Sequence, residues 1–143
     1  MIRATRGKFF LEIFSGSGNL SKAVARLGIS CHLFDNKLGP PGDVLRPEVE
    51  KRIMQLLATG RCIGVWLAMP CGTLSRARRG NERGGPKPLR GEDARSLWGL
   101  PGLTGLDLIR VRAANCLIRF VCRVANKCFE HSVPYYIQNP LTS

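Results

Sequence analysis

The sequence has few acidic residues, few histidines and no long apolar run. Only 10 aspartates and glutamates stand against 22 lysines and arginines, so the formal net charge of the 143 residues is +12. No apolar run is long enough to cross a membrane. Glu12 and the glycines after it interrupt the apolar run near the N-terminus, so we expect no secretory signal. The positive charge favours a polyanionic partner, of which nucleic acid is the commonest; solubility or an arginine-rich source composition is the alternative.

The cysteines follow no metal-binding spacing. None of the six forms a Cys-x-x-Cys pair, and His32 and His131 do not complete a zinc-like arrangement. Most of them lie inside apolar runs, where free cysteine behaves as a small hydrophobe. We therefore expect a reducing, intracellular location, nuclear or cytoplasmic, and no metal site.

The chain has the size of one ordinary domain, and no repeat or clear linker divides it. Apolar runs and helical repeats alternate along it. This alternation predicts one α/β domain over 1–143, with a Rossmann-like open, mostly parallel sheet and helices on both faces. The expected strands lie at 9–14, 29–35, 62–68 and 133–137, and the expected helices at about 20–27, 47–59 and 104–130.

A glycine turn joins the first expected strand to the first expected helix. Gly16 and Gly18 follow the apolar run, and the helical repeat begins directly after them. Glycine lets the backbone turn sharply, and free N–H groups at a helix start attract polar or anionic groups. The combination is typical of the front of a nucleotide-binding βαβ unit. However, Ser21 stands where the full motif has a third glycine, and similar turns occur without a ligand.

Polar residues follow the other expected strands. Asp35 ends the second strand, where nucleotide-binding α/β folds place an acid on ribose hydroxyls, although an ordinary turn aspartate would look the same. Ligands of open α/β sheets bind beyond the carboxyl ends of the strands. We therefore expect Gly16, Asp35, Asp43, Cys71 and Gln138 to lie at one edge of the sheet.

Cys71 is the one cysteine that we interpret as a candidate nucleophile. It follows Pro70 on a glycine-containing loop that leaves a buried strand, where backbone N–H groups could support a thiolate. The alternative is a structural cysteine.

The segment 76–103 is predicted to be a long basic loop, mobile in the free protein. Its lysines and arginines stand among glycines and prolines, and acids are few. The basic groups could hold phosphates, and Trp98 could stack on a base. A disordered surface insert is the alternative. The candidate nucleic-acid ligands are Arg76, Arg78, Arg79 and Arg83.

Taken in order, several short segments of the sequence resemble motifs of the DNA cytosine-5 methyltransferases, which use S-adenosylmethionine. The stretch Glu12-Ile13-Phe14-Ser15-Gly16-Ser17-Gly18 is similar to the family's first motif, which cradles the cofactor. Gly42-Asp43-Val44 is similar to its Gly-Asp-Ile motif. Pro70-Cys71-Gly72-Thr73-Leu74-Ser75 is similar to the Pro-Cys-Gln-x-Phe-Ser motif of the nucleophile, and Gln138-Asn139-Pro140 stands where the family has Glu-Asn-Val.

The resemblance implies a role for each matching residue. Phe14 would face the adenine of S-adenosylmethionine, Asp35 would hold its ribose, and Asp43 would approach the adenine amino group. Gln138 would replace a glutamate that binds and helps to protonate the cytosine; glutamine can form hydrogen bonds but cannot act as a general acid. The implied cofactor-binding residues are Glu12, Phe14, Ser15, Gly16, Gly18, Asp35, Asp43 and Pro70, and the implied catalytic residues are Cys71 and Gln138.

Two kinds of function remain open. The first is a methyltransferase-like domain that acts on cytosine, in DNA rather than RNA. The second is a catalytically inactive nucleic-acid-binding module on a degenerate or truncated methyltransferase scaffold. The family's later motifs have no counterpart before Ser143, so we expect an incomplete fold of about five strands instead of seven, or one that a second chain completes. A methyltransferase of amino groups, suggested by Asn139-Pro140, and a Rossmann oxidoreductase are further alternatives.

Overall fold

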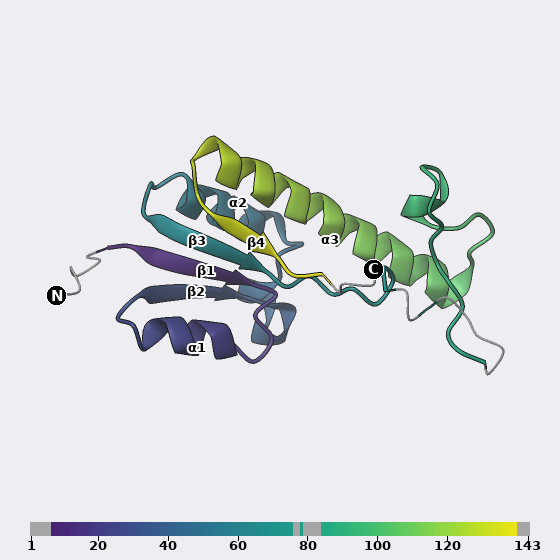
Figure 1. Ribbon diagram of the computed structural model, residues 1–143, viewed down its shortest axis with the longest axis horizontal. Coiled ribbons are helices and arrows are strands. Elements are labelled where there is room, and N and C mark those ends of the chain that lie inside the picture. Colours follow the sequence, from purple (N-terminus) through teal and green to yellow (C-terminus); the bar gives the residue numbers. More distant parts are fainter. Residues whose placement is uncertain (1–6, 76–77, 79–83, 140–143) are drawn as a thin grey trace. The chain divides into compact units, whose positions relative to one another are not determined.

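The computed structural model describes residues 7–75, 78 and 84–139 (Figure 1). Within these residues the protein has a mixed α/β structure with a four-stranded parallel sheet and three α-helices. The elements are β1 (Phe9–Ile13), α1 (Asn19–Ala25), β2 (Ser30–Phe34), α2 (Pro47–Leu57), β3 (Cys62–Leu67), α3 (Gly105–Glu130) and β4 (Tyr135–Ile137), with the 3-10 helices η1 (Asn36–Leu38), η2 (Pro40–Gly42) and η4 (Ser96–Trp98). The predicted α/β class and parallel sheet are confirmed.

The chain divides into two compact units. The first consists of Met1–Met69 and Phe120–Gln138, and the second of Pro70–Arg119 and Asn139–Ser143. The whole sheet belongs to the first unit. Helix α3 contributes to both, because its residues up to Arg119 belong to the second unit and those from Phe120 onward to the first.

The sheet has the strand order β2-β1-β3-β4, and each neighbouring pair is parallel. The connection from β1 to β2 crosses the sheet in one direction, whereas those from β2 to β3 and from β3 to β4 cross it in the other. Because such crossovers are right-handed, the reversal places α1 on one face of the sheet and α2 with the C-terminal turns of α3 on the other. Figure 1 shows α1 on the opposite side of the strands from α2 and the C-terminal turns of α3.

The prediction of about five strands is wrong for the described residues, which hold four. The segment 84–103 forms no strand, because glycines and prolines interrupt its apolar residues and proline cannot donate to a strand ladder. Beyond β4 the structure describes only Gln138 and Asn139. None of the described helices is long and apolar enough to cross a membrane.

The core of the first unit lies on the face of the sheet that carries α2. Val49, Ile53 and Leu57 recur every four residues of α2 and are buried, which is the spacing of one helix face. The helix begins at Pro47, whose missing N–H costs nothing in a first turn. The strands and α3 supply other core side chains with 0% exposure: Leu11, Ile13, Val65, Leu67, Phe120 and Val124.

The four strands end level with one another. Ile13 is paired with Phe34 of β2 and with Leu67 of β3, and Leu67 is paired with Ile137 of β4. The ladder continues one residue further, because the N–H of Ala68 donates to Ile13 (3.1 Å) and that of Gln138 donates to Leu67 (2.9 Å). The loops after all four strands therefore leave from one row at the carboxyl edge of the sheet.

Candidate functional site

The turn after β1 places a glycine against open space. Gly16 (φ +54°) and Gly18 (φ +67°) are both left-handed, as is Phe14 (φ +63°), which is rare for an aromatic residue. A Cβ on Gly18 would lie 2.7 Å from Cδ2 of Leu33, so packing against β2 requires this glycine. A Cβ on Gly16 would meet no atom within 4 Å. The backbone at Gly16 is therefore open to an approaching ligand.

Two buried carboxylates hold this turn in place. Glu12 (5% exposed) accepts a hydrogen bond from the N–H of Ser21 (2.8 Å) in α1. Asp35 (8% exposed) accepts from the N–H of Gly16 at Oδ2 (2.8 Å) and from the N–H of Lys37 at Oδ1 (2.9 Å). Each Asp35 oxygen keeps a lone pair for a further donor. The sequence predicted that Gly16 and Asp35 share an edge, and the structure brings them into direct contact.

Phe14 and Ser15 begin the turn with their backbone fixed to β2. The N–H groups of both residues donate to the carbonyl of Phe34, at 2.7 and 3.2 Å. The half-buried Phe14 ring lies edge-on to Phe120 of α3, with 6.1 Å between the ring centroids. The Ser15 hydroxyl is buried and has no hydrogen-bond partner within the described residues. A buried hydroxyl without a partner is unfavourable, and a polar ligand bound at this turn would satisfy it.

The Gly42-Asp43 pair lies beside Asp35. Gly42 is buried, and a Cβ at this position would overlap the carbonyl oxygen of Asp35, so only glycine fits. Asp43 is half-buried, and its Oδ1 accepts from the N–H of Leu45 (3.1 Å). The glycine turn, Asp35 and Gly42 therefore form one packed cluster in the first unit.

Gln138 leaves the same edge of the first unit. Its backbone extends the pairing of β4 with β3, and the residue is exposed. Its side-chain amide therefore stands in water at the position where the resemblance implies a catalytic group.

Cys71 opens a tight helical turn in the second unit. Its carbonyl accepts hydrogen bonds from the N–H groups of Leu74 (2.8 Å) and Ser75 (3.0 Å). Cys71 itself is half-buried, between the exposed residues Pro70 and Gly72. A Cβ on Gly72 would meet no atom within 4 Å, so the turn is open around the cysteine.

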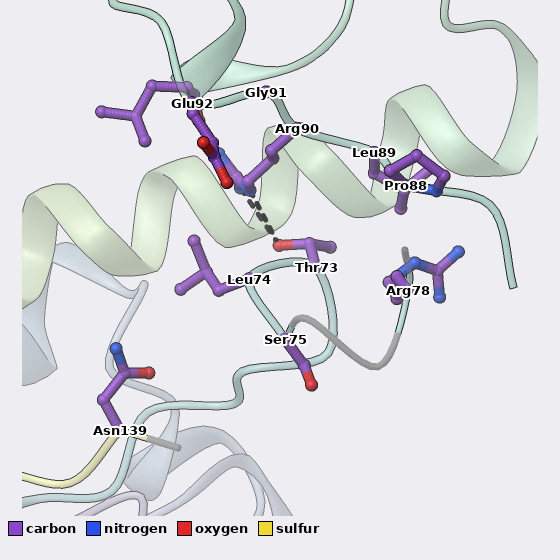
Figure 2. Close-up of a pocket in the computed structure, with 11 residues that line it drawn as sticks. Thr73, Leu74, Ser75, Arg78, Pro88, Leu89, Arg90, Gly91, Glu92 and Asn139 are labelled. Atoms are coloured by element: carbon purple, nitrogen blue, oxygen red, sulfur yellow. Dashed lines mark hydrogen bonds between the residues drawn. The ribbon is translucent and has the colours of Figure 1, made fainter. Parts of the chain in front are cut away.

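The guanidinium of Arg90 forms hydrogen bonds with this turn and with other parts of the second unit. Arg90 donates from Nε and Nη2 to the Thr73 hydroxyl (3.2 and 3.1 Å), as Figure 2 shows, and from Nη1 to the carbonyl of Leu97 and to Oδ1 of Asn115 (both 2.8 Å). Burial lowers the pKa of Arg90. Among the described residues all of its partners are neutral.

Arg90 and Thr73 line a pocket of about 450 Å³ in the second unit (Figure 2). This volume is within the range of small-molecule sites. The polar groups around it include hydroxyls, a carboxylate, an amide and a second guanidinium. The residues that carry them are Thr73, Ser75, Arg78, Arg90, Glu92 and Asn139.

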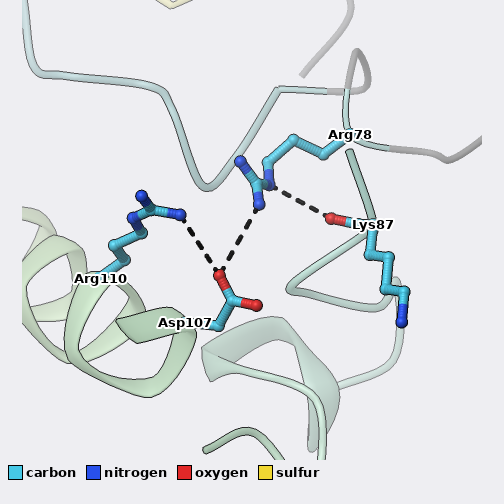
Figure 3. A network of polar contacts seen from close by, with 4 residues as sticks. All are labelled: Arg78, Lys87, Asp107 and Arg110. Carbon is cyan, nitrogen blue, oxygen red and sulfur yellow. Dashed lines mark hydrogen bonds and ion pairs between the residues drawn. The ribbon is translucent and has the colours of Figure 1, made fainter. Parts of the chain in front are cut away.

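Arg78 is the one predicted nucleic-acid ligand that lies within the described residues. Its Nε donates to the carbonyl of Lys87 (3.2 Å), and its Nη2 lies 4.0 Å from Oδ1 of Asp107, which also pairs with Arg110 at 3.5 Å (Figure 3). Asp107 therefore partly neutralises Arg78. The other three predicted ligands, Arg76, Arg79 and Arg83, lie outside the described residues.

The remaining cysteines are poor nucleophiles or carry no distinguishing contact. Burial raises the pKa of the Cys62 thiol and raises that of Cys128 to about 12. All six cysteines are free thiols. In the part of the chain that the structure describes, no three histidine, cysteine, aspartate or glutamate residues gather as they would around a metal ion.

Sequence reasoning missed the residues that organise the second unit. Arg90 was one more arginine of a basic segment, and Asn115 an ordinary polar residue of a helix. They meet across 25 positions of sequence, and neither follows a periodic pattern. No signal in one sequence distinguishes them from their neighbours.

No protein-family model matches the chain, and searches of the curated proteins and of the solved structures give no match.

Proposed function

We propose that the chain is an S-adenosylmethionine-binding, methyltransferase-like domain with a Rossmann-like first unit, and that it acts on cytosine in nucleic acid through Cys71. One observation carries the proposal: a left-handed glycine turn after β1 contacts the acid that ends β2, at the carboxyl edge of a parallel sheet. Nucleotide-like ligands bind at this place in open α/β sheets.

The free groups of the turn suit such a ligand. The space beside Gly16 admits a close approach, and the buried Ser15 hydroxyl offers an unused donor and acceptor. Asp35 keeps lone pairs for ribose hydroxyls, and Asp43 has one carboxylate oxygen that is not committed to Leu45. By the resemblance, Phe14 borders the adenine. S-adenosylmethionine, when bound, supplies an electrophilic methyl group.

Cys71 is the group that we assign to the cytosine. Its sulfur, as the thiolate, adds to the ring carbon next to carbon-5, and carbon-5 thereby becomes nucleophilic. After methyl transfer a proton leaves carbon-5, and the carbon–sulfur bond breaks to return the thiolate. Gln138 can hydrogen-bond the ring but cannot supply a proton to it.

Calorimetric titration with S-adenosylmethionine tests the cofactor claim. We expect saturable binding to the wild type and about tenfold or greater loss in Gly16→Val, because the branched side chain fills the open space beside the turn. Gly28→Val is the matched control. Gly28 is also left-handed (φ +77°) with no atom within 4 Å of its Cβ position, but it precedes β2 and so lies at the opposite edge of the sheet. Absence of binding by the wild type, or preference for a nicotinamide cofactor, would overturn the claim.

Transfer of labelled methyl groups to cytosine-containing DNA tests the reaction. Cys71→Ser should abolish transfer, whereas Cys122→Ser, which changes an exposed thiol of α3, should leave it unchanged. Gln138→Glu should raise the rate, because it restores a group able to carry a proton. Transfer that survives in Cys71→Ser would remove Cys71 from the mechanism.

A catalytically inactive nucleic-acid-binding module is the second candidate. The exposed amide of Gln138, in place of the family's acid, is the observation that favours it. This candidate predicts binding of nucleic acid that weakens steeply with salt, together with no methyl transfer by the wild type or by Gln138→Glu.

A further inference from the structure

Trp98 is an exposed aromatic residue whose backbone accepts a side-chain hydrogen bond. It closes η4 in the second unit, and 43% of its surface is accessible. Single exposed apolar side chains are common on protein surfaces, so the exposure of Trp98 does not by itself indicate binding. Its significance depends on the contacts around it.

Two side chains fix the backbone around the indole. Asn115 of α3 donates from Nδ2 to the carbonyl of Trp98 (2.8 Å), and Arg90 donates to the carbonyl of Leu97 (2.8 Å). Gly99 closes the turn: its N–H donates to Ser96 (3.0 Å), and a Cβ at this position would lie 2.8 Å from Cγ1 of Val111. The backbone that carries the indole is therefore held before any ligand binds, which reduces the entropy lost on binding.

One arginine lies against the ring, and a second shares its face of α3. The guanidinium carbon of Arg119 lies 5.4 Å from the ring centroid, within the range of a cation–π contact. Arg119 follows Asn115 by one helical turn, and Arg112 precedes Asn115 by three residues, so all three share one face of α3. Arg112 and Arg119 are exposed, and neither forms an ion pair with a carboxylate of the described residues. Farther along the helix, Arg123 differs, because it pairs with Glu50.

We propose that Trp98, with Arg119 and Arg112, is a stacking site for a base and its phosphate in single-stranded nucleic acid. An exposed indole stacks on any base, and unpaired arginines track the backbone phosphates. A duplex hides the faces of its bases, so it does not fit this site. The inference rests on nucleic acid being the partner in the proposed function, but it requires neither bound cofactor nor methyl transfer.

Fluorescence gives a direct test, because the chain has only two tryptophans. In a Trp66→Phe background the emission comes from Trp98 alone. We expect a short cytosine-rich DNA strand, and a single-stranded RNA of the same sequence, to quench it on titration without cofactor. A duplex of that sequence should leave the emission unchanged.

Variants separate stacking from charge. With a fluorescein-labelled strand read by anisotropy, Trp98→Ala should weaken affinity about tenfold, and Trp98→Phe should retain most of it. Arg119→Ala should reduce the salt dependence by about one counterion. The matched control is Arg123→Ala, which removes the same charge from the same helix at an ion-paired position. Circular dichroism checks that each variant is folded.

Three results would overturn the site: no binding of single strands by the wild type, binding without a change in Trp98 emission, or equal affinity in Trp98→Ala. Failure of the cofactor titration leaves these measurements unaffected. Likewise, an unchanged Trp98 emission would not contradict binding of S-adenosylmethionine.

Discussion

The two units hold their candidate ligand-binding loops by opposite means. In the first unit, carboxylates accept hydrogen bonds from backbone N–H groups: Glu12 from Ser21, and Asp35 from Gly16 and Lys37. In the second unit, Arg90 and Asn115 donate to backbone carbonyls around Trp98. The first arrangement leaves a turn suited to a polar ligand with donors, and the second leaves a surface rich in positive charge.

The two loops also differ in how much regular secondary structure supports them. The turn of the first unit leaves a strand whose end is paired on both sides. The described segment 84–103 of the second unit has only η4 as regular structure, so a few side-chain contacts carry its conformation. Single substitutions should therefore disturb the second unit more than the first.

The largest effect is expected for Arg90→Ala. The change removes every hydrogen bond of the guanidinium to Thr73, Leu97 and Asn115, and hydrogen bonds to charged groups contribute about 1.5–3 kcal/mol. We expect a local opening that is easier by about 3 kcal/mol. Hydrogen exchange should report it at the N–H of Leu100, which is bonded to Leu89.

The control for this change is Arg95→Ala. Arg95 lies in the same segment and is exposed, so its removal should leave exchange as in the wild type. If Arg90→Ala and Arg95→Ala behave alike, the contrast between the two units fails.

Asp35→Asn should have the next largest effect. The amide offers one acceptor oxygen where the carboxylate offers two, so the N–H of either Gly16 or Lys37 loses its partner in a buried place. We expect a loss of about 2 kcal/mol in the free energy of unfolding, measured with urea. Asp43→Asn, whose single acceptor role an amide can fill, should cost less than about 0.5 kcal/mol. Similar costs for both would contradict a structural role of Asp35.

Alanine at the two turn glycines should separate strain from packing. Both positions have positive φ, which costs a non-glycine residue about 1 kcal/mol. Gly18→Ala also crowds Leu33 and should cost about 2 kcal/mol in total, whereas Gly16→Ala should cost about 1 kcal/mol. Chemical denaturation of both variants measures the difference. Equal losses would show that Gly18 is not held by packing.

The smallest expected effect is on how the stability of the fold depends on pH. Burial lowers the pKa of His32 below 6.5, and Arg52 and Arg61 add to the shift. Below pH 6.5 the unfolded chain therefore binds a proton that the folded chain does not, so stability should fall from there until the folded-state pKa is reached. His32→Gln should remove this part of the slope. His131→Gln leaves His32 in place and should preserve it.

The order of the helices and strands could be predicted from the sequence, because each element has its own periodic spacing of apolar residues. The helix predicted at 104–130 is Gly105–Glu130, and the strand predicted at 62–68 is Cys62–Leu67. The last strand begins at Tyr135 rather than at residue 133. Pro134 lacks an N–H and contributes only its carbonyl, to Val65.

The sequence predicted the candidate site only where the order and direction of the strands determine which residues lie close together. Parallel strands end at one edge, so Gly16 and Asp35 had to lie near each other. The Arg90 network could not be predicted in the same way. Its partners Thr73 and Asn115 lie 17 and 25 positions away, and single long-range side-chain contacts leave no periodic trace in a sequence.

The packing of Gly42 limits which residues can replace it during evolution. Its place against the Asp35 carbonyl forbids a side chain whether or not a ligand binds. At Gly16 only the backbone angle limits replacement, and asparagine tolerates that angle. Position 16 can thus change to asparagine over generations while position 42 stays glycine, so the glycine at 42 reflects the demands of the fold and not those of a ligand.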